Sequence, residues 1–524
     1  MKKSLVMQFH SRLVVARPRH ETTCNSGPGR FAGVQWVAVP ARFPDRRDQI
    51  GSALPKLGSE AASGSAVARR TDWKAVWAVE CSRPMFALAI AFALLPGLTR
   101  VAAGDFQGAT HLMPFEEDTI AYSKAKADSA VERLQRRLDA GQTTLPYDAN
   151  RGYLPALLRE LGIPVSSQML VFSKTSLQRE RISPRNPRSL FFNDEAYVGY
   201  IPGAHLLEIS VADPKLGGVF YTLEQKQVLS PKFTRNDQCL ECHASAKTMG
   251  VPGHLVRSFE TDETGVIDFS TGASLVNHRT PLSDRWGGWY VTGTHGSQLH
   301  RGNLVGREAF AKQITEPNHL GNLTNLSRFF DPSPYPQGGS DIVALMIFEH
   351  QAHMHNFLAR LTCEATISQA QYGHLNYLKA KVDSFLKYLL FTEEAPLSAP
   401  IQGSNEFAAE FARRGPKDQH GRSLRDLDLQ TRLFKHPCSY LIYSDAFKQM
   451  PSNLKAQILK RLHEVLSGRE AAPEFGSMPR QSKQAIFEIL ADTTKDLPEF
   501  EAFRGSPAGA SNSKPKATVN EASR

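Results

Sequence analysis

The sequence predicts an α+β fold, in which an antiparallel β-meander is followed by a mainly α-helical C-terminal half. In the first half, β-branched and aromatic runs alternate with Pro- and Gly-containing turns, which is typical of successive antiparallel strands. In the second half, apolar residues recur with helical spacing. Strands are expected at 168–173, 197–201, 206–212 and 219–223, and helices at 341–361, 368–391, 442–466 and 481–492.

Two further helices are expected before the meander. Apolar residues recur over Glu116–Leu138, and Gly141 provides a stop signal after them. A shorter helix is expected over Tyr153–Leu161. An irregular β segment follows at 254–294, where Trp286, Trp289 and Tyr290 lie between glycines. These aromatics either pack on a prosthetic group or simply fill the core.

The chain divides into five segments by composition and periodicity. A Gly- and Pro-rich stretch at 331–340 separates the two halves, and the last residues are rich in Ser, Ala, Lys and Pro. The expected segments are a non-native or disordered leader at 1–84, a signal peptide at 85–103, a β-rich domain at 104–335, a helical domain at 341–500 and a disordered tail at 501–524.

Residues 85–95 form an uninterrupted apolar run. The run is too short to cross a bilayer, which needs about 20 apolar residues, but it suits the hydrophobic region of a signal peptide. Val101, Ala102 and Ala103 then provide the small residues that a signal peptidase site requires, so we expect the signal to end near Ala103. We therefore expect export to the periplasm and no stable membrane span after cleavage. Residues 1–84, which precede the apolar run, have two explanations. Either translation starts downstream of Met1, near Val67, or the protein has a long N-terminal extension followed by an uncleaved membrane anchor.

The net charge of +10 belongs mainly to the leader. Residues 1–84 contain fourteen Lys and Arg against six Asp and Glu, so the remaining chain carries only +2. A near-neutral chain offers no electrostatic basis for binding nucleic acid, and we expect no such partner.

The most informative motif is Cys239-Leu-Glu-Cys242-His243, a C-x-x-C-H pattern. Six cysteines and 17 histidines among 524 residues would produce it by chance about 0.002 times per chain. The pattern is the attachment signature of c-type haem: the two thiols form thioethers with the haem vinyl groups, and the histidine binds the iron. A half zinc site and a dithiol redox pair are the alternatives, but no second C-x-x-C and no βαβ context accompany the motif.

On this motif the chain resembles the c-type cytochromes. The flanking stretches Ser167–Ser176, Phe191–Asp194 and Arg285–Gly293 are similar to a group of large bacterial exported proteins with a single CXXCH motif. The resemblance implies one covalent haem c, held by Cys239 and Cys242 with His243 as axial ligand, and a role in electron transfer.

A second axial ligand is left open among several residues. His295 is the favoured candidate because Gly293 and Gly296 lie on either side of it. Glycines at these positions permit close approach of the backbone to a ligand. The other candidates are His300, His254, His278 and Met249. A five-coordinate iron is an alternative, and so is the interpretation that these histidines are exposed loop residues.

Two further features remain. His350 and Met354 are expected on the apolar face of a helix capped by Ser340, with His353 beside them. His350 and His353 could bind a metal or relay protons. The alternative is that they are hydrogen-bonded histidines of the core. Cys363 and Cys438 either form a disulfide or remain free thiols.

Three functions are compatible with these patterns. The leading prediction is a periplasmic electron carrier that meets a redox partner protein. A peroxidase-like haem oxidoreductase is the first alternative, and it needs an open iron position. A haem-based sensor is the second.

Overall fold

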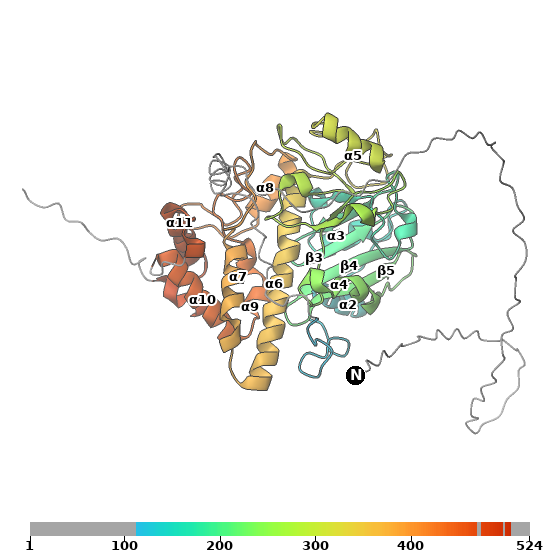
Figure 1. Ribbon diagram of the computed structural model, residues 1–524. Helices are drawn as coiled ribbons and strands as arrows, with labels where there is room; N and C mark the ends of the chain where they lie inside the picture. Colours follow the sequence, from blue (N-terminus) through green and yellow to red (C-terminus); the bar gives the residue numbers. More distant parts are fainter. Residues whose placement is uncertain (1–111, 469–472, 496–497, 505–524) are drawn as a thin grey trace, which may run out of the picture. The chain divides into compact units, whose positions relative to one another are not determined.

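A seven-stranded antiparallel sheet and a set of helices make up the structure, a computed structural model that describes residues 112–468, 473–495 and 498–504 (Figure 1). The predicted α+β class and the helical C-terminal half are therefore confirmed. The predictions for 1–84 and 85–103, and most of the tail prediction, lie outside the described residues. The tail prediction is wrong for 501–504, which belong to a 3-10 helix at Pro498–Arg504 with Phe503 buried.

The sheet has the strand order β6-β5-β4-β3-β2-β1-β9 and every neighbouring pair is antiparallel. Strands β1 to β6 follow one another as a meander, and β9 joins the free edge of β1. The bounds are β1 Met169–Val171, β2 Arg188–Phe192, β3 Ala196–Tyr200, β4 Leu206–Asp213, β5 Gly217–Glu224, β6 Phe233–Arg235 and β9 Trp289–Tyr290.

The turn between β4 and β5 is built by Asp213 and Gly217. The carboxylate of Asp213 accepts hydrogen bonds from the backbone amides of Lys215 and Leu216, both at 2.9 Å. Gly217 has a φ of +76°, and a Cβ there would lie 2.5 Å from the carbonyl oxygen of Pro252. Only glycine combines this backbone conformation with so close an approach.

The sequence predicts β1, β3, β4 and β5 correctly but not β2 and β6, and β9 lies in the irregular β segment expected at 254–294. Strand β6 has three residues and β9 two, which is too short for a period-2 pattern. The irregular segment 254–294 contains β9 and a separate two-stranded sheet, β7 Arg257–Phe259 with β8 Ala273–Leu275.

The first helix is shorter than the one expected over Glu116–Leu138. Helix α2 covers Ala130–Asp139 and begins at Ser129, whose hydroxyl accepts from the amide of Glu132 at 3.2 Å. Residues before it form turns, with Ala121 at a φ of 50°. Helix α3, Leu154–Glu160, is confirmed.

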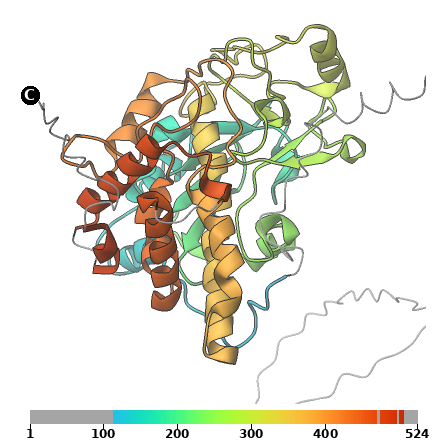
Figure 2. The ribbon, with the colours of Figure 1, turned by 60° about the vertical axis from the view of Figure 1, so that its left-hand side comes forward.

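Helix α6, Ile342–Tyr372, is the longest helix among the described residues and lies between the sheet and the other C-terminal helices (Figures 1 and 2). Its N-cap is Asp341, not Ser340 as the sequence predicts, since the Asp341 carboxylate accepts from the amide of Ala344 at 2.8 Å. The helix is buried on nearly all sides and ends at Gly373, with a φ of 72°. It therefore runs eleven residues past the expected end at 361.

The remaining α-helices follow α6, except α4, Leu240–His243, and α5, Gly306–Thr315. The helix expected over 442–466 begins only at Ser452, because a 3-10 turn at Tyr440–Tyr443 and a short α9 precede it. The expected helix 368–391 is divided at Gly373, and α8 is not predicted. The bounds are α7 Lys379–Leu389, α8 Asn405–Arg413, α9 Asp445–Lys448, α10 Ser452–Ser467 and α11 Arg480–Thr493.

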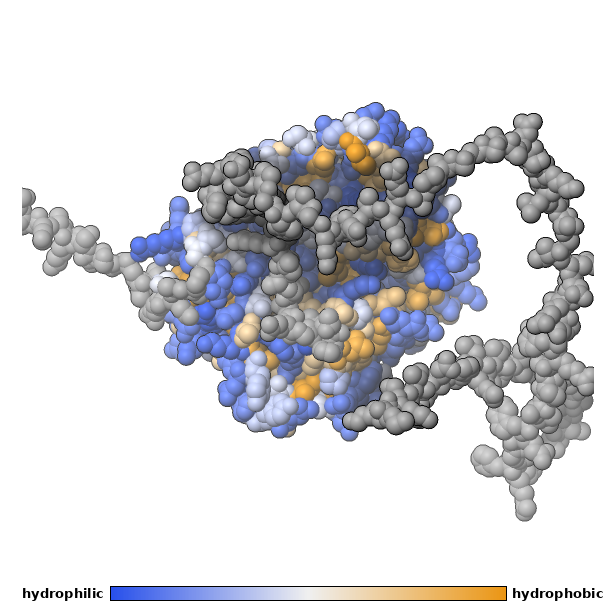
Figure 3. Space-filling model, in the orientation of Figure 1, coloured by the Kyte–Doolittle hydropathy of each residue, from blue (hydrophilic) through white to orange (hydrophobic). Residues whose placement is uncertain are grey.

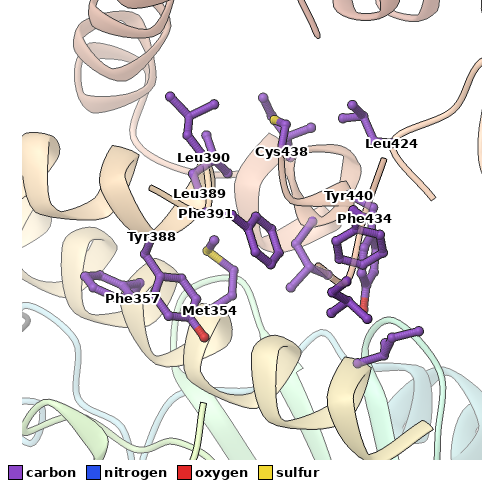
Figure 4. Packing of buried hydrophobic residues seen from close by; sticks show 14 of the residues in the cluster. Met354, Phe357, Tyr388, Leu389, Leu390, Phe391, Leu424, Phe434, Cys438 and Tyr440 are labelled. Atoms are coloured by element: carbon purple, nitrogen blue, oxygen red, sulfur yellow. The ribbon is translucent and has the colours of Figure 1, made fainter. Parts of the chain in front are cut away.

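The two faces of the sheet pack against different helices. Phe191 and Val198 contribute to a cluster with α2 and α3, whereas Phe192 and Tyr197 join the cluster around α6. That second cluster continues into α7 and the segment around Phe434, as Figure 4 shows. The expected boundary at 335–341 is thus a change in secondary structure within a shared core.

In the part of the chain that the structure describes, no helix has the length and apolarity to span a membrane. On the face shown in Figure 3 the surface is mainly hydrophilic, with apolar residues gathered toward its lower middle.

Candidate functional site

The C-x-x-C-H residues lie at one edge of the sheet, directly after β6. A 3-10 turn at Asp237–Cys239 leads into the short helix α4, Leu240–His243. The side chain of Asn236 starts this turn by accepting from the amide of Gln238 at 3.1 Å. Arg235 anchors the preceding strand through hydrogen bonds to the carbonyl oxygens of Ala125 and Tyr122, at 3.0 and 2.7 Å. The motif is thus a helical turn fixed at its start.

Cys239 and Cys242 are both free thiols, and they are three positions apart on this turn. Residues at this spacing project from the same side of a helix, so the two sulfur atoms can react with one partner. Cys239 is half-buried and Cys242 is exposed. Burial raises the pKa of the Cys239 thiol to about 11, which keeps it protonated.

His243 is held through its Nδ1 atom, which lies 2.9 Å from the carbonyl oxygen of Gly253. A carbonyl oxygen only accepts, so Nδ1 carries the proton and donates it. The lone pair of the ring is therefore on Nε2, the atom through which such a histidine binds a metal. Burial lowers the pKa of His243, partly opposed by this same hydrogen bond, and so favours the neutral imidazole that a metal ligand requires.

Gly253 is itself held by the central helix. Its amide donates to the carbonyl oxygen of His243 at 2.8 Å, which makes the pairing of the two residues reciprocal. A Cβ on Gly253 would lie 2.2 Å from Oδ1 of Asn356 on α6. Asn356 accepts from the amide of His254 and donates to its carbonyl oxygen, both at 2.8 Å. The position of His243 therefore depends on α6.

His254 lies in the interior behind His243. Its side chain is buried, and neither Nδ1 nor Nε2 has a hydrogen-bond partner among the residues that the structure describes. The His254 ring centroid is 4.5 Å from that of Tyr197 and 6.0 Å from that of Phe220. The Phe220 ring also packs against His243, at 4.8 Å, so one aromatic ring contacts both imidazoles.

A hydrogen-bonded chain extends from Tyr197 into the core. The Tyr197 hydroxyl accepts from Nε2 of Gln351 at 2.9 Å and lies 2.8 Å from Nδ1 of His355. The Tyr440 hydroxyl donates to Oε1 of Gln351 at 2.6 Å. Burial lowers the pKa of His355 to about 4, so its ring is neutral at pH 7. Tyr197 is thereby held in one orientation beside His254.

His295 and His300 lie elsewhere and hydrogen-bond with the backbone. Nε2 of His295 accepts from the amide of Asn322 at 2.9 Å, and Nδ1 of His300 accepts from the amide of Gly302 at 3.0 Å. Their ring centroids are 4.6 Å apart, and no ring contact or hydrogen bond joins either to 239–243 in the described part of the chain. The interpretation of these histidines as exposed loop residues is wrong, because His254, His278, His295 and His300 are all buried.

Met249 is in the left-handed conformation at the end of a 3-10 turn, with a φ of 59°. Its side chain is buried in the core cluster around α6, and its carbonyl oxygen accepts from Nη1 of Arg360 at 2.5 Å.

His350 belongs to a buried hydrogen-bonded network. Its Nδ1 lies 2.8 Å from Nδ1 of His278, and its Nε2 lies 2.8 Å from the hydroxyl of Ser439. His353 is buried nearby, with its ring 4.8 Å from that of Tyr388. Within 112–468, 473–495 and 498–504, no group of three or more His, Cys, Asp or Glu side chains is arranged to hold a metal ion. For His350 the structure agrees with the core-histidine interpretation.

A buried ion pair lies on the same helix and is not evident from the sequence. Glu349 pairs with Arg285 and also accepts from the indole nitrogen of Trp286 at 2.9 Å. Burial raises the pKa of Glu349 to about 7 against the opposing effect of Arg285. Trp286 and Trp289 lie in the core cluster, which agrees with the core-filling interpretation.

Cys363 and Cys438 are free and buried in different clusters. The structure therefore has free thiols in place of the disulfide that the sequence leaves open.

Comparisons with protein-family models, with curated proteins and with solved structures find no match to this chain.

Proposed function

We propose that this protein is an exported c-type haem protein that transfers electrons through one covalently bound haem. The observation that carries the proposal is the hydrogen bond from Nδ1 of His243 to the carbonyl oxygen of Gly253. It leaves Nε2 as the ligand atom, next to two free thiols on the same helical turn. Metal-binding histidines characteristically donate their other ring N–H to such an acceptor.

The residues of the motif fit haem c in their chemistry. Cys239 and Cys242 would form the thioethers, and His243 would bind the iron. When bound, the haem supplies a metal centre that exchanges single electrons. The protein holds the imidazole in one tautomer through Gly253, and Gly253 in place through Asn356. Export, which the apolar run at 85–95 predicts, would bring the chain to the compartment where c-type haem is attached.

The proposal is tested by expressing the full chain in a bacterial host with and without cytochrome c maturation machinery. Haem staining after denaturing electrophoresis and the pyridine haemochrome spectrum then measure covalent haem. We expect one haem per chain, only when the machinery is present. Cys239→Ser together with Cys242→Ser should abolish the stain. Cys363→Ser is the matched control and should retain it.

Two results would contradict the proposal. The first is a folded, exported wild-type chain without covalent haem in the presence of the machinery. The second is a haem stain that persists in the double serine variant. A stoichiometric zinc ion in the haem-free protein would favour the zinc interpretation of the motif.

A further inference from the structure

An ion pair between Arg188 and Glu208 joins two strands of the sheet close to the motif. Nη2 of Arg188, at the start of β2, is 3.0 Å from Oε2 of Glu208 on β4. The guanidinium reaches β4 across Gly199 of β3, where a Cβ would lie 2.7 Å from the Arg188 Nε. The hydroxyl of Ser176 and the side-chain amide of Gln178 donate to Oε1 of Glu208 at 2.7 and 3.2 Å. The pair therefore has a defined position.

This ion pair and the imidazole of the motif lie on the same side of the sheet. Glu208 is directly opposite Thr222 of β5. Phe220 is two residues from Thr222 on the same strand, so its side chain points to the same side of the sheet as that of Glu208. The ring of Phe220 packs against that of His243, with 4.8 Å between the centroids. The side chain that supports His243 is thus a neighbour of the ion pair on this face.

The two charged side chains are partly shielded from solvent. Arg188 is 18% exposed and Glu208 is 13% exposed. Asp237, which pairs with Arg235 just before the motif, is 40% exposed. Water and salt screen partly buried charges less than exposed ones, so the Arg188–Glu208 pair has the stronger influence per charge at a given distance.

The two charges act unequally on the two kinds of functional group in the motif. Burial lowers the pKa of His243 and the hydrogen bond with Gly253 raises it; Arg188 then lowers it by more than Glu208 raises it. At Cys239 the order is reversed. Burial raises the pKa of this thiol to about 11, and Glu208 raises it by more than Arg188 lowers it. The positive end of the pair is therefore directed toward the imidazole, and the negative end toward Cys239.

We propose that Arg188, held in position by Glu208, raises the reduction potential of the haem iron bound by His243. This inference rests on the proposed function, since it requires the haem at Cys239 and Cys242. Reduction of Fe(III) to Fe(II) adds one electron and lowers the charge of the iron by one, so a nearby positive charge favours the reduced state. Arg188 acts on the iron through space, and Glu208 is its positioning residue.

The experiment measures the midpoint potential of the haem-loaded full chain by spectroelectrochemistry. Arg188→Gln should lower the potential, because it removes the positive charge and leaves Glu208 unpaired. Glu208→Gln should raise the potential, because it leaves the positive charge alone. The variant that combines both substitutions should lie between the two single variants and below the wild type. Arg188→Lys, which keeps the charge, should stay closer to the wild type than Arg188→Gln.

The haem-free chain, expressed without maturation machinery, provides a second measurement of the same two charges. In a Cys242→Ser background, Cys239 is the only thiol of the motif, and its rate of alkylation by iodoacetamide follows the fraction of thiolate. Arg188→Gln should slow this alkylation, since it removes the charge that lowers the pKa of the thiol. Glu208→Gln should accelerate it.

Arg461→Gln is the matched control. Arg461 pairs with Asp383 at 2.7 Å with similar burial, 12% and 21% exposed, but this pair joins α10 to α7. The control should change neither the midpoint potential nor the alkylation rate of Cys239.

The direction of the shifts separates an electrostatic role from a structural one. Disruption of the fold around the motif would move Arg188→Gln and Glu208→Gln in the same direction, and that result overturns the inference. Unchanged potentials in both variants overturn it as well. Should Arg188→Gln not accumulate as folded protein, a potential that fails to rise in Glu208→Gln is sufficient to overturn it. Covalent haem that is absent from the wild type refutes the proposed function, whereas haem that is present with a potential insensitive to these charges refutes only the role of Arg188.

Discussion

Asn356 and His254 are joined by two hydrogen bonds, one in each direction, both 2.8 Å long. The side chain belongs to the middle of α6, and the bonded groups are the backbone amide and carbonyl of His254. The adjoining Gly253 orients His243. One buried carboxamide therefore connects the central helix to the segment that determines where the imidazole of the motif points.

Replacing Asn356 with alanine should reduce the free energy of unfolding by about 2–4 kcal/mol, because two buried backbone groups lose their partner. Denaturant unfolding of the variant, monitored by circular dichroism, measures this effect. Gln369→Ala is the matched control on the same helix, since the hydrogen bond of its side chain with Asn453 is exposed, and it should change stability by less than about 0.5 kcal/mol. Equal effects of the two variants would contradict the role assigned to Asn356.

Gly253→Ala should also destabilise the protein, by a steric route. The added methyl group would lie 2.2 Å from Oδ1 of Asn356 and 3.2 Å from Cβ of Thr248. Asn356 cannot move without breaking the buried hydrogen bonds described above, and Thr248 is held by a hydrogen bond from its hydroxyl to the carbonyl oxygen of Val251 at 2.7 Å. We therefore expect a loss of about 1–3 kcal/mol. Gly338→Ala tests the specificity of the effect, since its new methyl group would only reach ordinary contact, 3.6 Å from Pro332. A stability of Gly253→Ala within error of Gly338→Ala would refute this account.

The sequence predicts the order of strands and helices better than their packing. Strand β4 is evident because its side chains alternate between the two faces of the sheet. Helix α6 is recognised as a helix, but its length is not, because it is buried on nearly all sides and lacks a polar face. The extent of such a helix depends on what surrounds it.

For the candidate site, too, the sequence predicts some residues and not others. Cys239, Cys242 and His243 are found because their chemistry requires a fixed local spacing. Asn356 lies more than a hundred residues along the chain from the motif, and nothing local marks it. His254 is a candidate from the sequence only as one of several histidines. Its burial, and the absence of a partner for both of its ring nitrogens among the described residues, are evident only in the folded chain.

Cys363 and Cys438 should react with a thiol reagent only after unfolding. Burial raises the pKa of the Cys363 thiol to about 12 and that of Cys438 higher still, so few thiolates exist at pH 7. Iodoacetamide labelling across a denaturant series, followed by peptide mass spectrometry, should show both thiols becoming labelled together with the global unfolding transition. A disulfide between them would instead block labelling until a reductant is added, and that result would contradict the structure.

Stability should decrease as the pH falls below about 6.5, because several buried histidines are neutral in the folded state. Burial lowers the pKa of His300 to about 3, with the neighbouring His295 contributing, and lowers those of His278 and His350 well below their usual value. Between the unfolded and folded pKa values only the unfolded chain binds the proton, so acid favours unfolding. The stabilisation is complete above about pH 6.5 and is lost progressively below it.

His300→Asn tests this mechanism at one site. Asparagine can still accept the amide hydrogen bond of Gly302 through Oδ1, but it does not titrate. Between pH 7 and pH 5 the wild type should lose about 2 kcal/mol more stability than this variant, as expected for one histidine that stays neutral when folded. His374→Asn, at an exposed position, should keep the wild-type pH dependence. The mechanism is refuted if the His300 variant loses stability with pH as steeply as the wild type does, since that would show His300 to be protonated in the folded protein as well.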